Sequence, residues 1–204
     1  MTRREASARL VVPVGESDHA LGPETALVTL VEYGDYQCPY CGQAYPIIKG
    51  LLDRVGRQVR FVFRNFPLSS IHPHAESAAE AAEAAGAQGR FWAMHDVQFE
   101  NQEALGGEDL VGYASALGLD ESRFVGELTA HVHAARVRED FVGGVRSGVN
   151  GTPTFFINEG RHDGPFGLDS LLGAVEAEIA AASGRDGSDH SSQDHPRRPR
   201  HLER

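Results

Sequence analysis

The sequence of 204 residues has few basic residues, two cysteines and no long apolar run. No stretch approaches the roughly 18 consecutive apolar residues that a membrane-spanning helix requires, so we expect no membrane association. Lys and Arg number 19 against 29 Asp and Glu, for a formal net charge of -10, and residues 1–183 contain no basic stripe. Since nucleic-acid binders use Lys and Arg to neutralise phosphates, we expect no nucleic-acid partner.

The amino terminus also lacks the features of a secretory signal. Arg3 and Arg4 are not followed by the run of about seven or more apolar residues that such a signal contains. We therefore expect a cytoplasmic location. Disulfides are rare in the cytosol, where two nearby cysteines are typical of redox chemistry or metal binding rather than of structural cross-linking.

The two cysteines, Cys38 and Cys41, are separated by two residues. A disulfide that closes so short a loop removes little entropy from the unfolded chain, so the pair is a poor structural staple. One alternative is half of a zinc site, for which only His72 and His74 could supply further ligands within the predicted folded part. A hydrophobic strand leading into the pair is the wrong context for a zinc knuckle. Redox chemistry without a metal or other cofactor is therefore favoured.

Hydrophobic patterns place the pair in a βαβ unit. A continuous apolar run over residues 26–33 predicts a buried strand, helical spacing follows over 44–55, and an alternating pattern predicts a second strand over 60–66. Such a unit has parallel strands, and Cys38 follows the carboxyl end of the first one, where open α/β sheets place their active sites. A β-prone run with an internal proline, residues 10–14, predicts an edge strand.

Later segments indicate how the chain is divided. Strand patterns disappear after residue 71, and alanine-rich or amphipathic patterns predict about five helices before strand and helix patterns return. From residue 184 the sequence has almost no apolar residue, which predicts disorder. The expected organisation is an N-terminal arm with the βαβ half (1–71), a helical insertion (72–149), a ββα half (150–183) and a disordered tail (184–204).

The position of Cys38 at the start of a helix predicts how the two thiols divide the chemistry. Unpaired backbone N–H groups and the positive end of the helix dipole stabilise a thiolate, which can lower a thiol pKa from about 8.5 to between roughly 3.5 and 7.5. Cys41 lies one turn further in and should be more buried and less ionised. We expect Cys38 to be the nucleophile and Cys41 the resolving cysteine, with a mixed disulfide on Cys38 as the intermediate.

A second motif, Gly151-Thr152-Pro153, places a proline at the start of a strand pattern. Together with the cysteine pair and the strand-helix-strand frame, it resembles the thioredoxin superfamily. More closely, the chain resembles the DsbA-like thiol-disulfide oxidoreductases of the Thioredoxin_4 type. Four segments carry the resemblance: LVEYGDYQCPYCG, FVFRNFPL, HPHAESAAEAAEAAGAQGRFWAMHD and GVNGTPTFFINEG.

The resemblance implies an α/β thioredoxin fold with an all-helical domain inserted between the βαβ and ββα halves. It makes Cys38 the attacking cysteine, Cys41 the resolving one and Pro153 a cis-proline. The backbone of Thr152 would pair with an extended substrate while its hydroxyl faces Cys38.

The residues between the cysteines, Pro39 and Tyr40, would contact substrate together with Thr152. Oxidant members of the family often have Pro-His at these two positions. Tyr40 supplies no positive charge to stabilise the Cys38 thiolate, so extreme oxidising power is not expected.

Glu32 is an acid within the hydrophobic run before the cysteines. The superfamily keeps a buried acid beneath the resolving cysteine, and a buried carboxyl with a raised pKa can exchange a proton with Cys41. The alternative is that Glu32 points to solvent at a strand edge. The proton-exchange role is favoured.

The function expected from the sequence is thiol-disulfide exchange in the cytosol with protein thiols and disulfides, coupled to an unidentified redox partner. Its direction is not encoded in the cysteine spacing. A glutathione-linked, glutaredoxin-like reductase is an alternative, because Pro-Tyr also separates the cysteines of many glutaredoxins. A non-enzymatic redox-sensing or binding module, with the helical insertion contacting a partner, is another.

Overall fold

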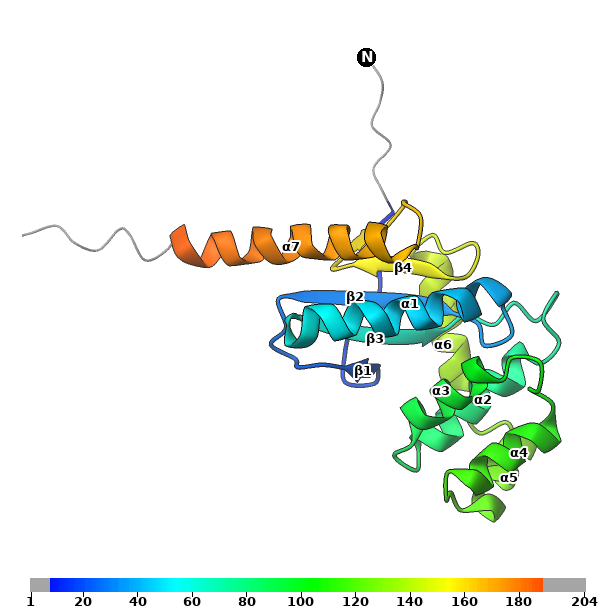
Figure 1. The fold of residues 1–204 in the computed structure, drawn as a ribbon. Coiled ribbons are helices and arrows are strands. Elements are labelled where there is room, and N and C mark those ends of the chain that lie inside the picture. Colours follow the sequence, from blue (N-terminus) through cyan, green and yellow to red (C-terminus); the bar gives the residue numbers. More distant parts are fainter. Residues whose placement is uncertain (1–7, 189–204) are drawn as a thin grey trace, which may run out of the picture.

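The computed structural model describes residues 8–188, which form a mixed five-stranded sheet, covering helices and a helical lobe at one end (Figure 1). The strand order is β1-β3-β2-β4-β5, and β2 and β3 are parallel while the other neighbours are antiparallel. The elements outside the lobe are β1 (His19–Leu21), β2 (Val28–Gly34), α1 (Pro39–Val55), a short 3-10 helix (Gly56–Gln58), β3 (Val59–Asn65), β4 (Thr154–Ile157), β5 (Gly160–Arg161) and α7 (Leu168–Ser188).

The predicted βαβ unit is confirmed. β2 and β3 pair in parallel from Val28 opposite Val59 to Gly34 opposite Asn65, with α1 as the crossover. Both strands are almost entirely buried, which explains their near-continuous apolar sequence. α1 begins directly after Cys38 and continues through Pro46 to Val55.

Alternating side chains of the strands build a core on each face of the sheet. Leu30, Phe61 and Phe155 pack on one side with residues of α1 and α7. Val31, Val62 and Phe156 pack on the other side with residues of the N-terminal arm and with Phe141 from the lobe. The sheet is thereby covered on both faces, as the α/β thioredoxin fold requires.

The helical insertion is also confirmed. Five helices form the lobe that Figure 1 shows beside the sheet: α2 (Ala75–Gly86), α3 (Phe91–Glu100), α4 (Gly107–Ala116), α5 (Glu121–Thr129) and α6 (Ala134–Arg146). The small-residue face of α2, which includes Ala78, Ala82 and Ala85, is fully buried and lets neighbouring helices approach closely. Among the helices of residues 8–188, none is long and apolar enough to cross a membrane.

Two expectations for the chain ends are wrong. Residues 10–14 form no strand, because the carbonyls of Val12 and Pro13 accept hydrogen bonds from the Arg64 guanidinium; the edge strand is β1 instead. The tail predicted from residue 184 is wrong for its first residues, since α7 continues to Ser188. Extending a helix already docked by its apolar face costs little per residue. Residues 189–204 of the predicted tail lie outside the described part.

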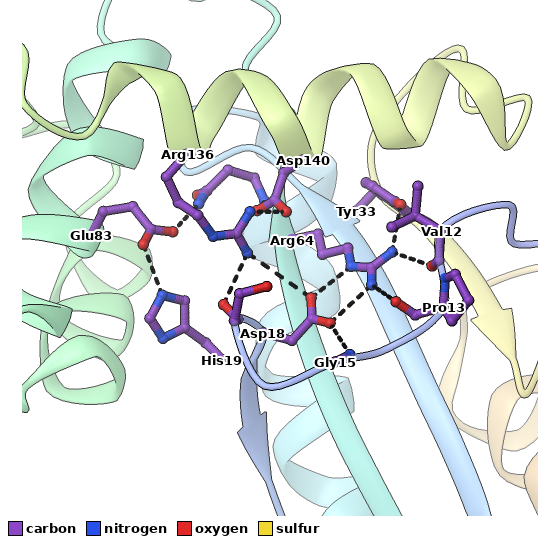
Figure 2. Close-up of polar contacts among 12 residues, drawn as sticks. Val12, Pro13, Gly15, Asp18, His19, Tyr33, Arg64, Glu83, Arg136 and Asp140 are labelled. Carbon is purple, nitrogen blue, oxygen red and sulfur yellow. Dashed lines mark hydrogen bonds and ion pairs between the residues drawn. The ribbon is translucent and has the colours of Figure 1, made fainter.

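A buried polar network joins the arm to the sheet (Figure 2). The Arg64 guanidinium makes a two-point ion pair with Asp18 at 2.7 and 2.9 Å and also donates to the Tyr33 hydroxyl at 3.0 Å. The side chains of Arg64 and Asp18 are 3% and 4% exposed. The Arg64 guanidinium also donates hydrogen bonds to the carbonyls of Val12 and Pro13, and these bonds hold the N-terminal arm in place.

The network continues into the insertion. Arg136 on α6 pairs with Asp140 at 2.5 Å, and Asp140 accepts the backbone N–H of Asn65 at the end of β3. The Asn65 side chain donates to Glu83 on α2, which also contacts His19 at 2.8 Å (Figure 2). Burial raises the pKa of Asp140 to about 6 against the opposing effect of Arg136. These contacts hold the lobe against the end of β3, the strand next to β2, which leads into the cysteines.

Candidate active site

The two cysteines lie where β2 gives way to α1. Cys38 is the N-cap residue of α1, and Cys41 lies one turn inside the helix. Both are free thiols, and their exposed fractions are 3% and 0%. Cys38 is thus slightly more exposed than Cys41, as the sequence predicts for an attacking and a resolving cysteine.

The environment separates the acidities of the two thiols. The hydrogen bond from Cys41, together with those from Thr152 and from the backbone N–H groups of Cys41 and Tyr40, lowers the pKa of Cys38 to about 5 against the opposing effect of burial. Burial raises the pKa of Cys41 well above its ordinary value, and the neighbouring charges of Glu32 and Cys38 act in the same direction. At neutral pH the geometry therefore supports a thiolate on Cys38 and a neutral thiol on Cys41.

The loop before β4 faces the Cys38 sulfur. The Thr152–Pro153 peptide bond is cis, and the Cys38 Sγ lies 3.4 Å from the Thr152 carbonyl oxygen. The buried Thr152 hydroxyl has no hydrogen-bond partner other than the Cys38 sulfur in residues 8–188. Of the two residues between the cysteines, Tyr40 is 59% exposed and is available to an approaching molecule.

Glu32 is buried close to the two cysteines and does not lie at an exposed strand edge. β2 is an interior strand of the sheet, and Glu32 is 3% exposed. Burial, with a contribution from the negative charge of Cys38, raises its pKa to about 8. It also lines a cavity of about 180 Å³ together with Lys49 and His95. A carboxyl group with this pKa is able to take up or release a proton near neutral pH.

Two further residues contact the cysteine loop without being singled out in the sequence. The backbone N–H of Asp35 donates to the Cys41 sulfur at 3.4 Å, and its buried carboxylate accepts from the backbone N–H groups of Gln37 and Leu68. Gln102 from the insertion donates to the loop carbonyls from the other side. Asp35 lies between the end of a predicted strand and the cysteine pair, and this position alone could have marked it as a residue of the site. Gln102 belongs to no motif that could have marked it.

Of the two histidines that could have supplied zinc ligands, His72 contacts a carboxylate of the cysteine loop and His74 precedes a helix. His72 Nδ1 lies 2.7 Å from the Asp35 carboxylate, and His74 is the residue before α2. In the described range, no cluster of three or more His, Cys, Asp or Glu side chains has the arrangement of a metal site.

The low pKa of Cys38 predicts an unusual pH profile for its reactivity. Because a pKa of about 5 leaves the thiolate dominant above that pH, the alkylation rate of the reduced protein should rise through pH 5 and level off before neutrality. Cys41 should stay unreactive. The measurement is the rate of iodoacetamide modification against pH, with the modified cysteine identified by mass spectrometry. A midpoint near 8.5, the approximate value of a free thiol, would contradict the assignment.

The sheet with its helical insertion, the Cys-x-x-Cys pair at a helix start and the cis-proline loop opposite it together define a thioredoxin fold of the DsbA-like type. The chain belongs to the thioredoxin family Thioredoxin_4, whose sequence profile, described as thioredoxin, matches residues 15–177.

Solved structures share this fold. BdbD from Bacillus subtilis has a TM-score of 0.74 at 24% identity, covering 86% of this chain and 98% of that protein. A thioredoxin-like oxidoreductase from Silicibacter pomeroyi has a TM-score of 0.68 at 29% identity, over 80% and 92% of the two chains. The alpha-DsbA1 protein of Wolbachia pipientis matches with a TM-score of 0.74 at 17% identity, over 86% and 97% of the two chains, a level that supports the fold alone.

Curated relatives are longer proteins. One named Na(+)/H(+) antiporter NhaA 1, from Salinispora arenicola, is 49% identical over 172 residues, which is 84% of this chain but 26% of that protein. Another named Na(+)/H(+) antiporter NhaA, from Herminiimonas arsenicoxydans, is 42% identical over 79% of this chain and 26% of its own length. This chain thus spans about a quarter of each of these relatives.

Proposed function

We propose that the protein exchanges disulfides with protein substrates through Cys38 and Cys41. The observation that carries the proposal is the Cys38 sulfur held between the Cys41 thiol and the Thr152–Pro153 loop. A substrate thiolate attacks Cys38 in the oxidised pair, which forms a mixed disulfide and releases Cys41. A second substrate thiolate then attacks the substrate sulfur of that bond and releases the Cys38 thiolate, so two electrons pass from substrate to protein. The reverse sequence reduces a substrate disulfide.

The surface around Cys38 suits an extended peptide. We propose that the backbone of Thr152 pairs with the substrate chain while Pro153 holds the loop beside the Cys38 sulfur. Pro39 and the exposed Tyr40 would contact residues of the substrate next to the reacting cysteine. A backbone-based contact accepts many sequences, which fits a protein substrate class rather than one small thiol.

The stabilised thiolate bears on the direction of exchange. A thiolate exists only in the reduced protein, so the groups that stabilise it favour the dithiol form and make the disulfide form more oxidising. Folding of the reduced protein gains from this charge, and the gain is lost as pH falls through about 5, the folded pKa of Cys38. Tyr40 has no positive charge with which to stabilise the Cys38 thiolate. Hydrogen bonds from Cys41, Thr152 and backbone N–H groups provide this stabilisation instead. We expect the chain to work as a donor of disulfides.

Glu32 is proposed to carry the proton for Cys41. When Cys41 attacks the mixed disulfide it must lose its proton, and when it leaves it must regain one. Glutamine at position 32 keeps the size of the side chain and removes the titrating group. Glu32→Gln should therefore slow resolution of a preformed mixed disulfide by on the order of a hundredfold, the lower end of what general acid-base catalysis contributes. The measurement is single-turnover release of a labelled peptide, and an unchanged rate would count against the role.

Three assays test the proposal together: oxidation of a dithiol peptide, reduction of insulin, and equilibrium with glutathione to give the potential. Inertness in both exchange assays would overturn it. If Cys41→Ser retained deglutathionylating activity at the wild-type rate, a glutaredoxin-like function would replace it. If Cys38→Ser left the biological role intact, a non-enzymatic binding or sensing function would replace it.

The cytosolic location stays a prediction from the sequence. The antiporter names of the relatives describe proteins of which this chain matches about a quarter, and we assign no ion transport to it.

A further inference from the structure

A single glutamine of the insertion reaches the cysteine loop. Gln102 lies in the connection between α3 and α4, and its Nε2 donates to the Tyr36 carbonyl at 2.7 Å and to the Cys38 carbonyl at 2.9 Å. The two carbonyls flank Gln37, so one carboxamide spans the turn that leads into α1. Cys38 and Gln102 are 64 positions apart in the chain, and the contact exists only because the insertion folds against the loop.

The first turns of α1 are shaped to admit this side chain. The Cys38 carbonyl also accepts the backbone N–H of Gly42 at 3.1 Å, which is the first helical hydrogen bond. A methyl group added at Gly42 would overlap the carboxamide of Gln102. The absence of a side chain at Gly42 therefore leaves the space in which Gln102 lies.

The insertion also holds the opposite side of the loop. The backbone N–H of His74, just before α2, donates to the Gln37 side-chain oxygen at 2.7 Å. The Asp35 carboxylate receives the Leu68 N–H at 2.9 Å and contacts His72 at 2.7 Å. Residues of the loop are thus bonded on one side by the segment entering the insertion and on the other by Gln102.

We propose that Gln102 is a positioning residue for disulfide exchange, holding the Tyr36 and Cys38 carbonyls so that the Cys38 sulfur stays against Cys41, Thr152 and the N–H groups that begin α1. The inference rests on the proposed function, because it matters only if the Cys38 thiolate reacts. It assigns the insertion a part in the chemistry, in addition to its packing against β3. Gln102 itself touches no reacting atom.

The test removes the two hydrogen bonds while keeping the volume. Gln102→Met retains the length of the side chain and has no N–H donor. We expect the thiolate pKa of Cys38, followed by ultraviolet absorbance in the reduced protein, to rise by at least about half a unit, which is about twofold less thiolate at pH 5. The rate of reaction with a small aromatic disulfide at pH 5 should fall by the same factor of about two.

Two other variants approach the same contact. Gly42→Ala should raise the thiolate pKa in the same direction by displacing the carboxamide, although alanine favours helix more than glycine does. Gln102→Glu keeps the shape but sets acceptor oxygens against two carbonyls, and should give a larger rise. The matched control is Gln88→Met, which loses two hydrogen bonds to the Asp120 backbone between α2 and α5 and should leave the thiolate pKa unchanged.

The outcomes separate this inference from the proposed function. A low thiolate pKa in the wild type that stays the same in Gln102→Met, Gln102→Glu and Gly42→Ala would overturn the role of Gln102 alone. An equal rise in Gln88→Met would also overturn it, because the effect would then reflect general loosening of the insertion. A wild-type pKa near about 8.5 would instead remove the basis of the proposed function itself.

Discussion

Cys38→Ser is expected to abolish disulfide exchange, lowering its rate by on the order of a thousandfold or more, the cost of losing a nucleophile. A serine hydroxyl forms no disulfide, and Cys41 cannot take over because it is fully buried with a raised pKa. Cys41→Ser cannot form the internal disulfide, but its Cys38 thiolate should still attack a substrate disulfide, release one substrate sulfur as a thiolate and accumulate as a mixed disulfide with the other. The measurements are oxidation of a dithiol peptide for Cys38→Ser and reaction of reduced Cys41→Ser with a disulfide peptide, with covalent complexes followed by mass spectrometry.

Comparison of Cys41→Ser with Cys41→Ala gives the control. The Cys41 side chain is the first cause of the low Cys38 pKa, and serine keeps a hydrogen-bond donor while alanine does not. Alanine should therefore raise the thiolate pKa of Cys38 more than serine does. Mixed disulfides on Cys41 in the Cys38→Ser variant would contradict the assignment of the two roles.

Arg64→Met is expected to destabilise the protein by about 3–5 kcal/mol in free energy of unfolding, the cost of leaving a buried charge without its partner. Asp18 is 4% exposed and makes its closest ion pair with Arg64. Methionine fills most of the volume but leaves Asp18 with only the more distant guanidinium of Arg136, at 4.0 Å, and leaves the carbonyls of Val12 and Pro13 without a donor (Figure 2). The measurement is urea unfolding of the reduced protein at neutral pH.

Two variants calibrate this loss. Arg123→Met removes an ion pair to Glu127 from a side chain that is 47% exposed, and should cost no more than about 1 kcal/mol. Adding Asp18→Asn to Arg64→Met should recover part of the stability, because the uncompensated charge is gone. If Arg64→Met and Arg123→Met had equal effects, the network would not be the stabilising element that its burial indicates.

The parts of the fold that the sequence predicted are those encoded by long local patterns. The strands of the βαβ unit are buried on both faces, so their apolar runs are continuous and visible. The lobe helices have amphipathic or alanine-rich periodicity over ten or so residues. β1 was missed because three residues, His19–Leu21, are too short for a pattern, and their strand conformation depends on pairing with β3.

The residues of the candidate site also divide into those that the sequence indicates and those that it does not. Cys38, Cys41 and Pro153 were found because their residue types and spacing carry chemistry that few other arrangements share. Glu32 was found because an acid within an apolar run is conspicuous. Gln102 was not found, because a glutamine in a polar turn has no distinctive neighbours, and its two contacts depend on how distant segments fold together.

The hydrogen bonds of Arg64 also bear on where the domain can be cut. The family profile begins at residue 15, yet the guanidinium binds the carbonyls of Val12 and Pro13 upstream of that point. Leu10 further donates its backbone N–H to Glu159 beside β5, which ties the two ends of the fold together. A recombinant protein that began at residue 15 would therefore lack two of the carbonyls that bind Arg64. An expressed domain should begin at Arg9 or earlier.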